Sequence, residues 1–117
     1  MNHIEKGRKG EDIATSFLKK KNYQIIERNY RYKKMEIDII ACYGDTIVFF
    51  EVKTRSKTTF GYPEEFVSPA QELRIMEAAT YFLETTALAH YFIRFDIISI
   101  IKNKNCQQVL HIEDAFH

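Results

Sequence analysis

The sequence predicts a single α/β domain whose central mixed β-sheet is flanked by helices. The apolar, β-branched runs at residues 35–43 and 46–53 are separated by a Gly44-Asp45 turn signal, which predicts an antiparallel hairpin. A helical pattern at residues 69–83 then leads to another apolar run at residues 91–101, and this order predicts a right-handed crossover between parallel strands. The chain has 117 residues, of which 45% are hydrophobic, enough for one globular core.

The N-terminal part of the chain predicts a helix followed by a short strand. Ile13, Ala14, Phe17 and Leu18 recur at helical spacing within residues 6–21, and Asn22 is expected to end that helix. Gly7 and Gly10 stand near its start, where glycine permits close approach of another backbone or a ligand. Residues 23–29 then form the predicted first strand.

The C-terminal half predicts one capped helix and two strands. Ser68, Pro69 and Gln71 have the layout of a capping box, with the Gln71 side chain reaching back to the cap. Residues 56–66 contain Gly61 and Pro63 without periodicity and are expected to form a loop that could order over a ligand. Residues 106–111 predict an edge strand, and residues 112–117 a tail.

Charge and cysteine usage narrow the class of protein. Residues 1–61 contain 13 Lys and Arg against 8 Asp and Glu, whereas residues 62–117 contain 4 against 8. This asymmetry favours a basic face that meets phosphates, although solvated lysines on helices give similar counts. Cys42 and Cys106 form no disulfide framework, and the sequence has neither a signal peptide nor an apolar run long enough to span a membrane. We therefore expect a cytoplasmic protein with no membrane partner.

Charged residues interrupt the two most apolar strands. Glu36 and Asp38 share one face of residues 35–43, and Glu51 and Lys53 share one face of residues 46–53, because side chains alternate along a strand. Burying an ionised group costs several kcal/mol or so unless a partner, a metal ion or a pKa change offsets it. A divalent cation is one candidate for that compensation.

The spacing of these residues suits phosphodiester chemistry. Asp38 and Glu51 on neighbouring strands could hold Mg²⁺ or Mn²⁺, and Lys53 could orient an attacking water or stabilise charge on the phosphoryl oxygens. Arg55 continues the same face and is a candidate phosphate contact. Glu36 is expected to be auxiliary. Glu11, judged by its position alone, fits a surface carboxylate in the first turn of a helix.

Other polar residues carry weaker signals. Basic and aromatic residues interleave in Tyr30-Arg31-Tyr32-Lys33-Lys34, which suits nucleic acid but also fits an exposed turn whose tyrosines pack on the sheet edge. Arg94 and Asp96 alternate on one strand and predict a partly buried structural ion pair. The four histidines, His3, His90, His111 and His117, lack metal-ligand spacing, so no zinc site is expected.

Several segments in this order resemble the YraN-like family of small bacterial proteins. They are Gly10-Glu11, residues 36–40, residues 50–55, Phe60-Gly61, residues 94–98 and the closing residues 114–116. That family looks like part of the restriction-endonuclease-like superfamily, a three-layer fold with a PD-(D/E)xK nuclease site, and is similar in pattern to archaeal Holliday junction resolvases. The resemblance implies that Glu11, Asp38 and Glu51 are metal-site residues and that Lys53 is the catalytic lysine.

Two positions depart from this resemblance. Members commonly carry Gly where this chain has Met35, and Lys where it has Gln71. Gln71 could keep a polar contact to the site or to nucleic acid, but the capping box also explains it. The leading hypothesis is a metal-dependent endonuclease acting on DNA, including branched or junction DNA, with a homodimer as one arrangement for two cuts. An inactive nucleic-acid-binding module and a protein-interaction domain are the alternatives.

Overall fold

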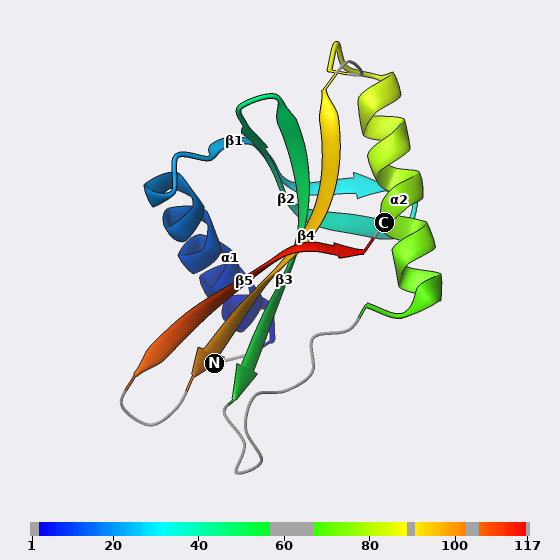
Figure 1. Ribbon diagram of the computed structural model, residues 1–117. Coiled ribbons are helices and arrows are strands. Elements are labelled where there is room, and N and C mark those ends of the chain that lie inside the picture. Colours follow the sequence, from blue (N-terminus) through cyan, green and yellow to red (C-terminus); the bar gives the residue numbers. More distant parts are fainter. Residues whose placement is uncertain (1–2, 57–66, 89–90, 103–105, 117) are drawn as a thin grey trace.

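The computed structural model describes residues 3–56, 67–88, 91–102 and 106–116, and these form two helices and five strands (Figure 1). In chain order the elements are α1 (His3–Lys20), β1 (Gln24–Tyr32), β2 (Met35–Tyr43), β3 (Thr46–Ser56), α2 (Pro69–Glu84), β4 (Phe92–Lys102) and β5 (Gln107–Phe116). The predicted loop beyond Ser56, including Phe60-Gly61, lies outside the described residues.

The strands form one mixed sheet in the order β1-β2-β3-β4-β5. β2 pairs antiparallel with both β1 and β3, β3 pairs parallel with β4, and β4 pairs antiparallel with β5. The predicted hairpin and the predicted parallel pair are therefore confirmed. In Figure 1, α2 lies in the connection between β3 and β4, as expected for a crossover helix.

The two helices pack on opposite faces of the sheet (Figure 1). The α1 side buries Ala14 and Leu18 with Ile39, Ala41, Val48, Phe50, Ile98 and Ile100. The α2 side buries Ile75, Ala78, Ala79, Phe82 and Leu83 with Ile37, Ile40, Ile47, Phe49, Phe95 and Phe116. Because both faces of β3 are covered from Ile47 to Phe50, its charged residues begin only where this buried segment ends, at Glu51.

The end of α1 and the start of α2 lie close to their predicted positions, whereas α1 begins at His3, so Glu11 does not lie in its first turn, where it was expected. α1 stops at Lys20, and Asn22 adopts a left-handed φ of 69°, a conformation that Asn tolerates better than most residues. At the start of α2, the Ser68 hydroxyl accepts a hydrogen bond of 3.1 Å from the backbone N–H of Gln71. The Gln71 side chain contacts Glu51, so the predicted reciprocal half of the capping box is replaced by a contact to the sheet. Neither described helix has the length and apolar character needed to cross a membrane.

Three strands run several residues beyond their predicted ends: β3 continues to Ser56, and β1 and β5 also lengthen. β1 continues through Tyr30 to Tyr32, because these rings pack on α2, Tyr30 against Phe82 at 5.1 Å and Tyr32 against Tyr81 at 4.5 Å between centroids. The expected turn is thereby reduced to the two residues between β1 and β2. β5 includes most of the expected tail, since Phe116 is buried and stacks on a β4 phenylalanine. A register irregularity between β4 and β5 hides this continuation from a simple alternating pattern.

Candidate metal centre

Asp38 lies where β2 and β3 separate. The paired register of these strands ends at Ile39 and Phe50. Beyond that point, the backbone N–H of Val52 donates a hydrogen bond of 2.8 Å to Asp38 Oδ2. A side-chain carboxylate therefore occupies the position where a strand carbonyl would otherwise accept, and this anchors Asp38 at the divergence of the two strands.

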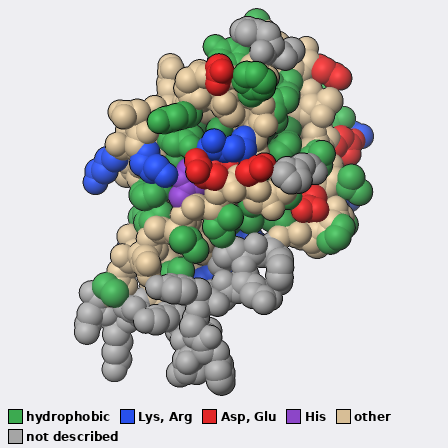
Figure 2. Space-filling model, in the orientation of Figure 1, with side chains coloured by type: hydrophobic (Ala, Val, Ile, Leu, Met, Phe, Trp, Pro, Cys, Tyr) green, Lys and Arg blue, Asp and Glu red, His purple; other side chains and the backbone are tan. Residues whose placement is uncertain are grey.

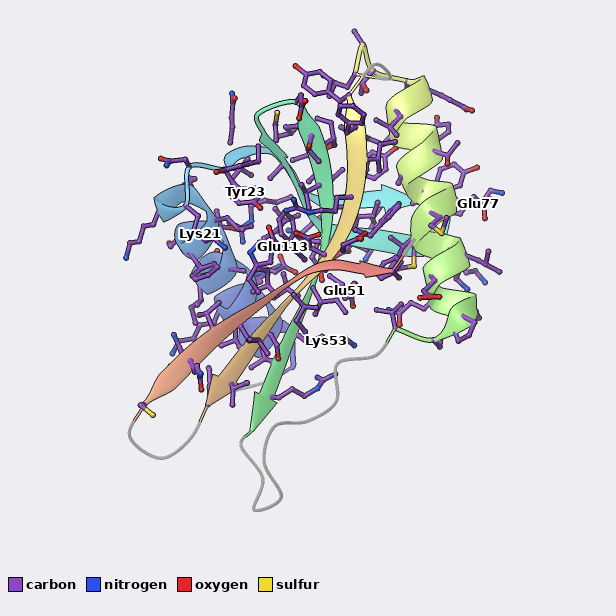
Figure 3. The ribbon with its side chains drawn as sticks, in the orientation of Figure 1. Lys21, Tyr23, Glu51, Lys53, Glu77 and Glu113 are labelled. Atoms are coloured by element: carbon purple, nitrogen blue, oxygen red, sulfur yellow. The ribbon has the colours of Figure 1, made fainter. Side chains whose placement is uncertain are left out.

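Glu51 and Lys53 follow the buried segment of β3, and Figure 3 shows them next to each other along this strand. The Gln71 amide lies 3.4 Å from Glu51 Oε1, so this face of β3 is directed toward the start of α2. The positive charge of Lys53 acts on Glu51 and favours its ionised form. The alternation of a strand thus places a carboxylate and an amine on the same side, as predicted.

Glu36 lies close to both Glu11 and Asp38. One carboxylate oxygen from each of Glu11, Glu36 and Asp38 lies within 4.8 Å of the other two. Glu36 also forms an ion pair of 3.2 Å with Arg31, whose side chain is largely exposed. The auxiliary role expected for Glu36 stays a prediction, and the geometry places its carboxylate beside those of Glu11 and Asp38. Glu51 stands outside this trio but acts on Asp38 through its charge.

The close approach of α1 to β3 brings Glu11 to the sheet. A Cβ on Gly10 would lie 2.6 Å from Thr54 Oγ1, so only glycine fits this contact without a shift. The neighbouring Glu11 side chain is only 13% exposed and lies 3.9 Å from an Arg28 nitrogen. Asn29 gives it a side-chain hydrogen bond. Glu11 is thus directed into the cluster, unlike the surface carboxylate that its position in the helix suggested.

Burial and mutual repulsion dominate the electrostatics of the cluster. Burial, and then the charge of Glu51, raise the pKa of Asp38 from 3.8 to about 8. Burial also raises the pKa of Glu51, against the opposing effect of Lys53. The pKa of Glu11 is likewise raised by burial, and the charge of Glu36 adds to the rise, while Asn29 opposes it. If all these carboxylates were ionised, their negative charge would exceed the positive charge of the nearby cations.

The donor set fits a hard divalent cation. Its oxygen-only composition is the one that Mg²⁺ and Mn²⁺ prefer. Two oxygens bound to one Mg²⁺ lie about 3–4 Å apart, because each Mg–O bond is about 2.1 Å long. The 4.8 Å spread of Glu11, Glu36 and Asp38 is somewhat wider, so these side chains would have to draw together around a bound cation. Asp38 is the residue that could bridge this trio and Glu51.

The family is shown by comparison with known proteins. A family model described as "Uncharacterised protein family UPF0102" matches residues 10–100. The chain belongs to this family. The matched segment includes every residue of the carboxylate cluster, from Glu11 through Glu36 and Asp38 to Glu51, together with Lys53 and Gln71.

Relatives in the UPF0102 family match along almost their whole length. A UPF0102 protein of Christiangramia forsetii is 48% identical over 114 residues, covering 97% of this chain and 95% of its own length. Relatives from Flavobacterium psychrophilum and Natranaerobius thermophilus are each 42% identical, covering 98% and 99% of this chain and 96% and 100% of their own lengths. The similarity therefore extends over both helices and all five strands.

The residues predicted to contact nucleic acid do not form one continuous group. Arg31, Lys33 and Lys34 lie at or beside the turn between β1 and β2, and their side chains are exposed. Lys33 pairs with Glu77 of α2 at 3.4 Å. Arg55 lies near the end of β3, half-buried, and donates a hydrogen bond to the Thr54 carbonyl. Gln71 lies in the first turn of α2 and contacts Glu51.

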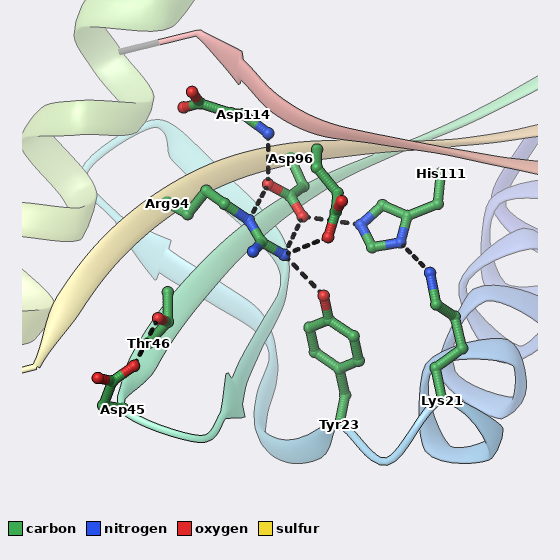
Figure 4. A network of polar contacts seen from close by, with 9 residues as sticks. Lys21, Tyr23, Asp45, Thr46, Arg94, Asp96, His111 and Asp114 are labelled. Atoms are coloured by element: carbon green, nitrogen blue, oxygen red, sulfur yellow. Dashed lines mark hydrogen bonds and ion pairs between the residues drawn. The ribbon is translucent and has the colours of Figure 1, made fainter.

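A second polar cluster surrounds Asp96 on β4 (Figure 4). The predicted ion pair is confirmed: Arg94 Nε and Nη2 each lie 2.9 Å from an Asp96 oxygen. The structure adds Tyr23, whose hydroxyl accepts from Arg94 at 2.6 Å, and His111, whose Nε2 lies 2.7 Å from Asp96. Figure 2 shows acidic and basic side chains beside a histidine near the middle of this face of the molecule.

The contact of His111 with the Arg94–Asp96 ion pair was not predicted from the sequence. Atoms of Asp96, His111 and Glu113 also lie within 4.8 Å of one another, the spacing of a metal site. Arg94 already binds Asp96 through two N–H groups, and the backbone N–H of Asp114 donates to the same carboxylate at 2.9 Å. Asp96 is therefore satisfied by the protein itself, which indicates a structural role.

Proposed function

We propose that this chain is a metal-dependent endonuclease that hydrolyses phosphodiester bonds in DNA. The observation that carries the proposal is the half-buried carboxylate cluster at the divergence of β2 and β3, with Lys53 two residues after Glu51. Such an array is typical of the restriction-endonuclease-like fold that the sequence resembles. Its place of action would be the cytoplasm, and a homodimer would allow two cuts in a junction.

The residues have distinct roles in this proposal. Asp38, Glu51, Glu11 and Glu36 would hold Mg²⁺ or Mn²⁺, with Asp38 fixed in place by the Val52 N–H. The bound cation would neutralise phosphate charge and lower the pKa of a water molecule. Lys53 would donate hydrogen bonds to a phosphoryl oxygen or orient the attacking water. Arg55 would bind a flanking phosphate, since it is not paired with a carboxylate among the described residues.

Cleavage assays with matched variants test this function. Purified protein is incubated with linear, flapped and four-way DNA in Mg²⁺ or Mn²⁺, and the products are resolved on denaturing gels. Asp38→Asn and Lys53→Met are expected to lower the cleavage rate by about 100-fold or more. Asp45→Asn and Lys20→Met, both at exposed positions, are the matched controls and should cleave as the parent does.

Two results would overturn the proposed nuclease function. Failure of the parent to cut any of these substrates with either metal would overturn the proposal. So would cleavage by Asp38→Asn and Lys53→Met at the parental rate. DNA binding that weakens steeply with salt, without cleavage, would support the inactive binding module, because phosphate neutralisation releases counterions. Absence of both activities would favour the protein-interaction domain.

A further inference from the structure

A groove beside the β1–β2 turn has a composition that suits a nucleotide. Its volume is about 310 Å³, and it is lined by Tyr32, Lys33, Lys34, Met35, Arg74 and Glu77. We propose that this groove binds one unpaired base, so that the preferred substrate is single-stranded or branched DNA rather than continuous duplex. The inference rests on the proposed nuclease function for its biological meaning, but the binding step is tested separately from cleavage.

The groove combines an apolar floor with a cationic rim. Tyr32 and Met35 are half-buried and pack against the α2 side of the core, and the Tyr32 ring is held against Tyr81 at 4.5 Å. Lys33, Lys34 and Arg74 contribute three positive charges against the single negative charge of Glu77. A nucleotide is complementary to both parts, because its base is flat and weakly polar while its phosphates are anionic.

Lys33 now occupies part of this space. Its ammonium group lies 5.2 Å from the centroid of the Tyr32 ring and 3.4 Å from a Glu77 oxygen. Both charged side chains are more than half exposed, so the ion pair holds Lys33 only weakly. An incoming base can take the place of the lysine over the ring, and the lysine can turn to a phosphate of the same strand. Figure 3 places Glu77 on α2, so its ion pair with Lys33 joins this helix to the β1–β2 turn.

The groove and the carboxylate cluster share two structural elements. Along β2, Met35 in the groove directly precedes Glu36, but their side chains point to opposite faces of the sheet, so β2 alone does not lead from the groove to the cluster. Along α2, Arg74 follows Gln71 by three residues, which places both on the same side of the helix. The Gln71 amide reaches Glu51 at 3.4 Å. A DNA strand bound in the groove would therefore run along α2 toward Glu51.

The apolar floor distinguishes an unpaired base from a duplex backbone. Contacts to duplex phosphates require exposed cations and hydrogen-bond donors, but they do not require an apolar hollow. Bases inside a duplex are stacked and paired, and reaching this groove would need their extrusion at a cost. Flaps, branch points and single strands already offer such bases. The groove therefore favours these substrates.

Base recognition can be separated from phosphate recognition with two probes. One is oligothymidylate of about 12 nucleotides, and the other is an abasic strand of the same length and phosphate charge. Fluorescence anisotropy is measured with Asp38→Asn in EDTA, so that cleavage cannot interfere. We expect the oligothymidylate to bind at least about fivefold more tightly than the abasic strand, as stacking of one base provides.

Variants in the groove should change the two affinities differently. Tyr32→Leu should bring the ratio of the affinities close to one. Met35→Gln keeps the length of the side chain but not its apolar character, and it should lower the same ratio if Tyr32→Leu does not fold. Arg74→Gln should weaken both probes equally and reduce the salt slope by about one phosphate contact. Lys20→Gln, an exposed cation on α1, is the matched control and should keep the parental ratio.

The outcomes separate the two proposals. Equal binding of both probes by the parent, or a parental ratio in both Tyr32→Leu and Met35→Gln, would overturn base binding in the groove. Neither result would affect cleavage of duplex DNA by the carboxylate cluster. Conversely, a base-dependent affinity without any cleavage would support base binding in the groove and overturn the proposed nuclease function.

Discussion

Asp38 and Asp96 are two aspartates in similar backbone settings with opposite electrostatic surroundings. Each lies where strand pairing is interrupted, and each accepts a backbone N–H, from Val52 at 2.8 Å and from Asp114 at 2.9 Å. Asp96 is also bound by Arg94 and lies 2.7 Å from a histidine nitrogen. Asp38 has other carboxylates as its charged neighbours.

This difference shifts the two pKa values in opposite directions. Burial alone would raise the pKa of Asp96, but hydrogen bonds from His111, Arg94 and the Asp114 N–H outweigh it and lower the pKa. Burial and Glu51 raise the pKa of Asp38 to about 8. Asp96 is thus surrounded by cations and hydrogen-bond donors, whereas the charged groups that act on Asp38 are carboxylates. The cation that Asp38 lacks is the one we propose it takes from solution.

The opposite shifts give opposite dependences of stability on pH. Asp96 has a lowered folded-state pKa, so its contribution is present above about pH 4 and is lost as the pH falls through the folded-state value. Asp38 has a raised folded-state pKa, so the folded protein holds a proton that the unfolded chain releases. Its contribution is complete below about pH 4 and is lost as the pH rises through about 8.

The largest effect is expected from removing the satisfied carboxylate. Asp96→Ala should lower the free energy of unfolding by about 3–5 kcal/mol, because Arg94 and the Asp114 N–H lose their buried partner. Urea unfolding at neutral pH measures the loss. Glu113→Ala is the matched control, since Glu113 also pairs with Arg94, at 3.2 Å, but is 58% exposed and should contribute less than about 1 kcal/mol. Equal unfolding midpoints for both variants would contradict the comparison.

Removing the charge of Asp38 should raise the free energy of unfolding, whereas removing Asp96 lowers it. In EDTA at pH 8, Asp38→Asn is expected to stabilise the protein by on the order of a few kcal/mol, because the amide keeps the Val52 hydrogen bond without a buried charge. Thermal unfolding from pH 5 to 9 should show stability falling with pH in the parent and falling less steeply in the variant, because Glu51 and Glu11 also have raised pKa values. Mg²⁺ should restore stability at high pH in the parent only. Asp45→Asn, at an exposed turn, should follow the parental profile; a parental profile in Asp38→Asn would disprove the assignment.

The order of the elements was predictable because it depends on local patterns. The apolar runs and the turn signal at Gly44 define the β2–β3 hairpin, and the observed β2 has the predicted bounds. The extensions of β1 and β5 were not predictable, because they depend on contacts distant in sequence. Tyr32 belongs to a strand because Tyr81 covers its ring, and Phe116 because it stacks on Phe95.

In the candidate site, too, local patterns identified some residues, whereas contacts between distant segments were not predictable. Asp38, Glu51 and Lys53 stand out because they interrupt apolar strands, and the strand period places the last two on one side. The approach of Glu36 to Glu11 depends on how α1 lies on the sheet, which no local pattern specifies. His111 was missed because its polar partners, Lys21 and Asp96, are distant in the chain and share no spacing.

Displacing α1 tests how Glu11 reaches the Asp38 cluster. Gly10→Ala would place a Cβ 2.6 Å from Thr54 Oγ1 and should cost about 1–3 kcal/mol, although alanine is otherwise favoured in helices by about 1 kcal/mol. The shift should also reduce the stabilisation by Mg²⁺, because it moves Glu11. Combining Gly10→Ala with Thr54→Ala removes the clashing oxygen and should recover both properties. If the double variant is as unstable as the single one, close packing at Gly10 is not the cause.

The smallest expected change would give the Asp38 cluster a cation of its own. Gln71→Lys should alter stability by less than about 1 kcal/mol, because the Ser68 cap uses the backbone N–H of residue 71 and the side chain is only partly buried. An ammonium group near Glu51 would favour its ionised form and compete with Mg²⁺. Calorimetry should therefore show Mg²⁺ binding weakened severalfold in Gln71→Lys but not in the uncharged control Gln71→Met. Equal affinities in the two variants would mean that this position acts only through the cap, and that a cation supplied here does not make the cluster resemble that of Asp96.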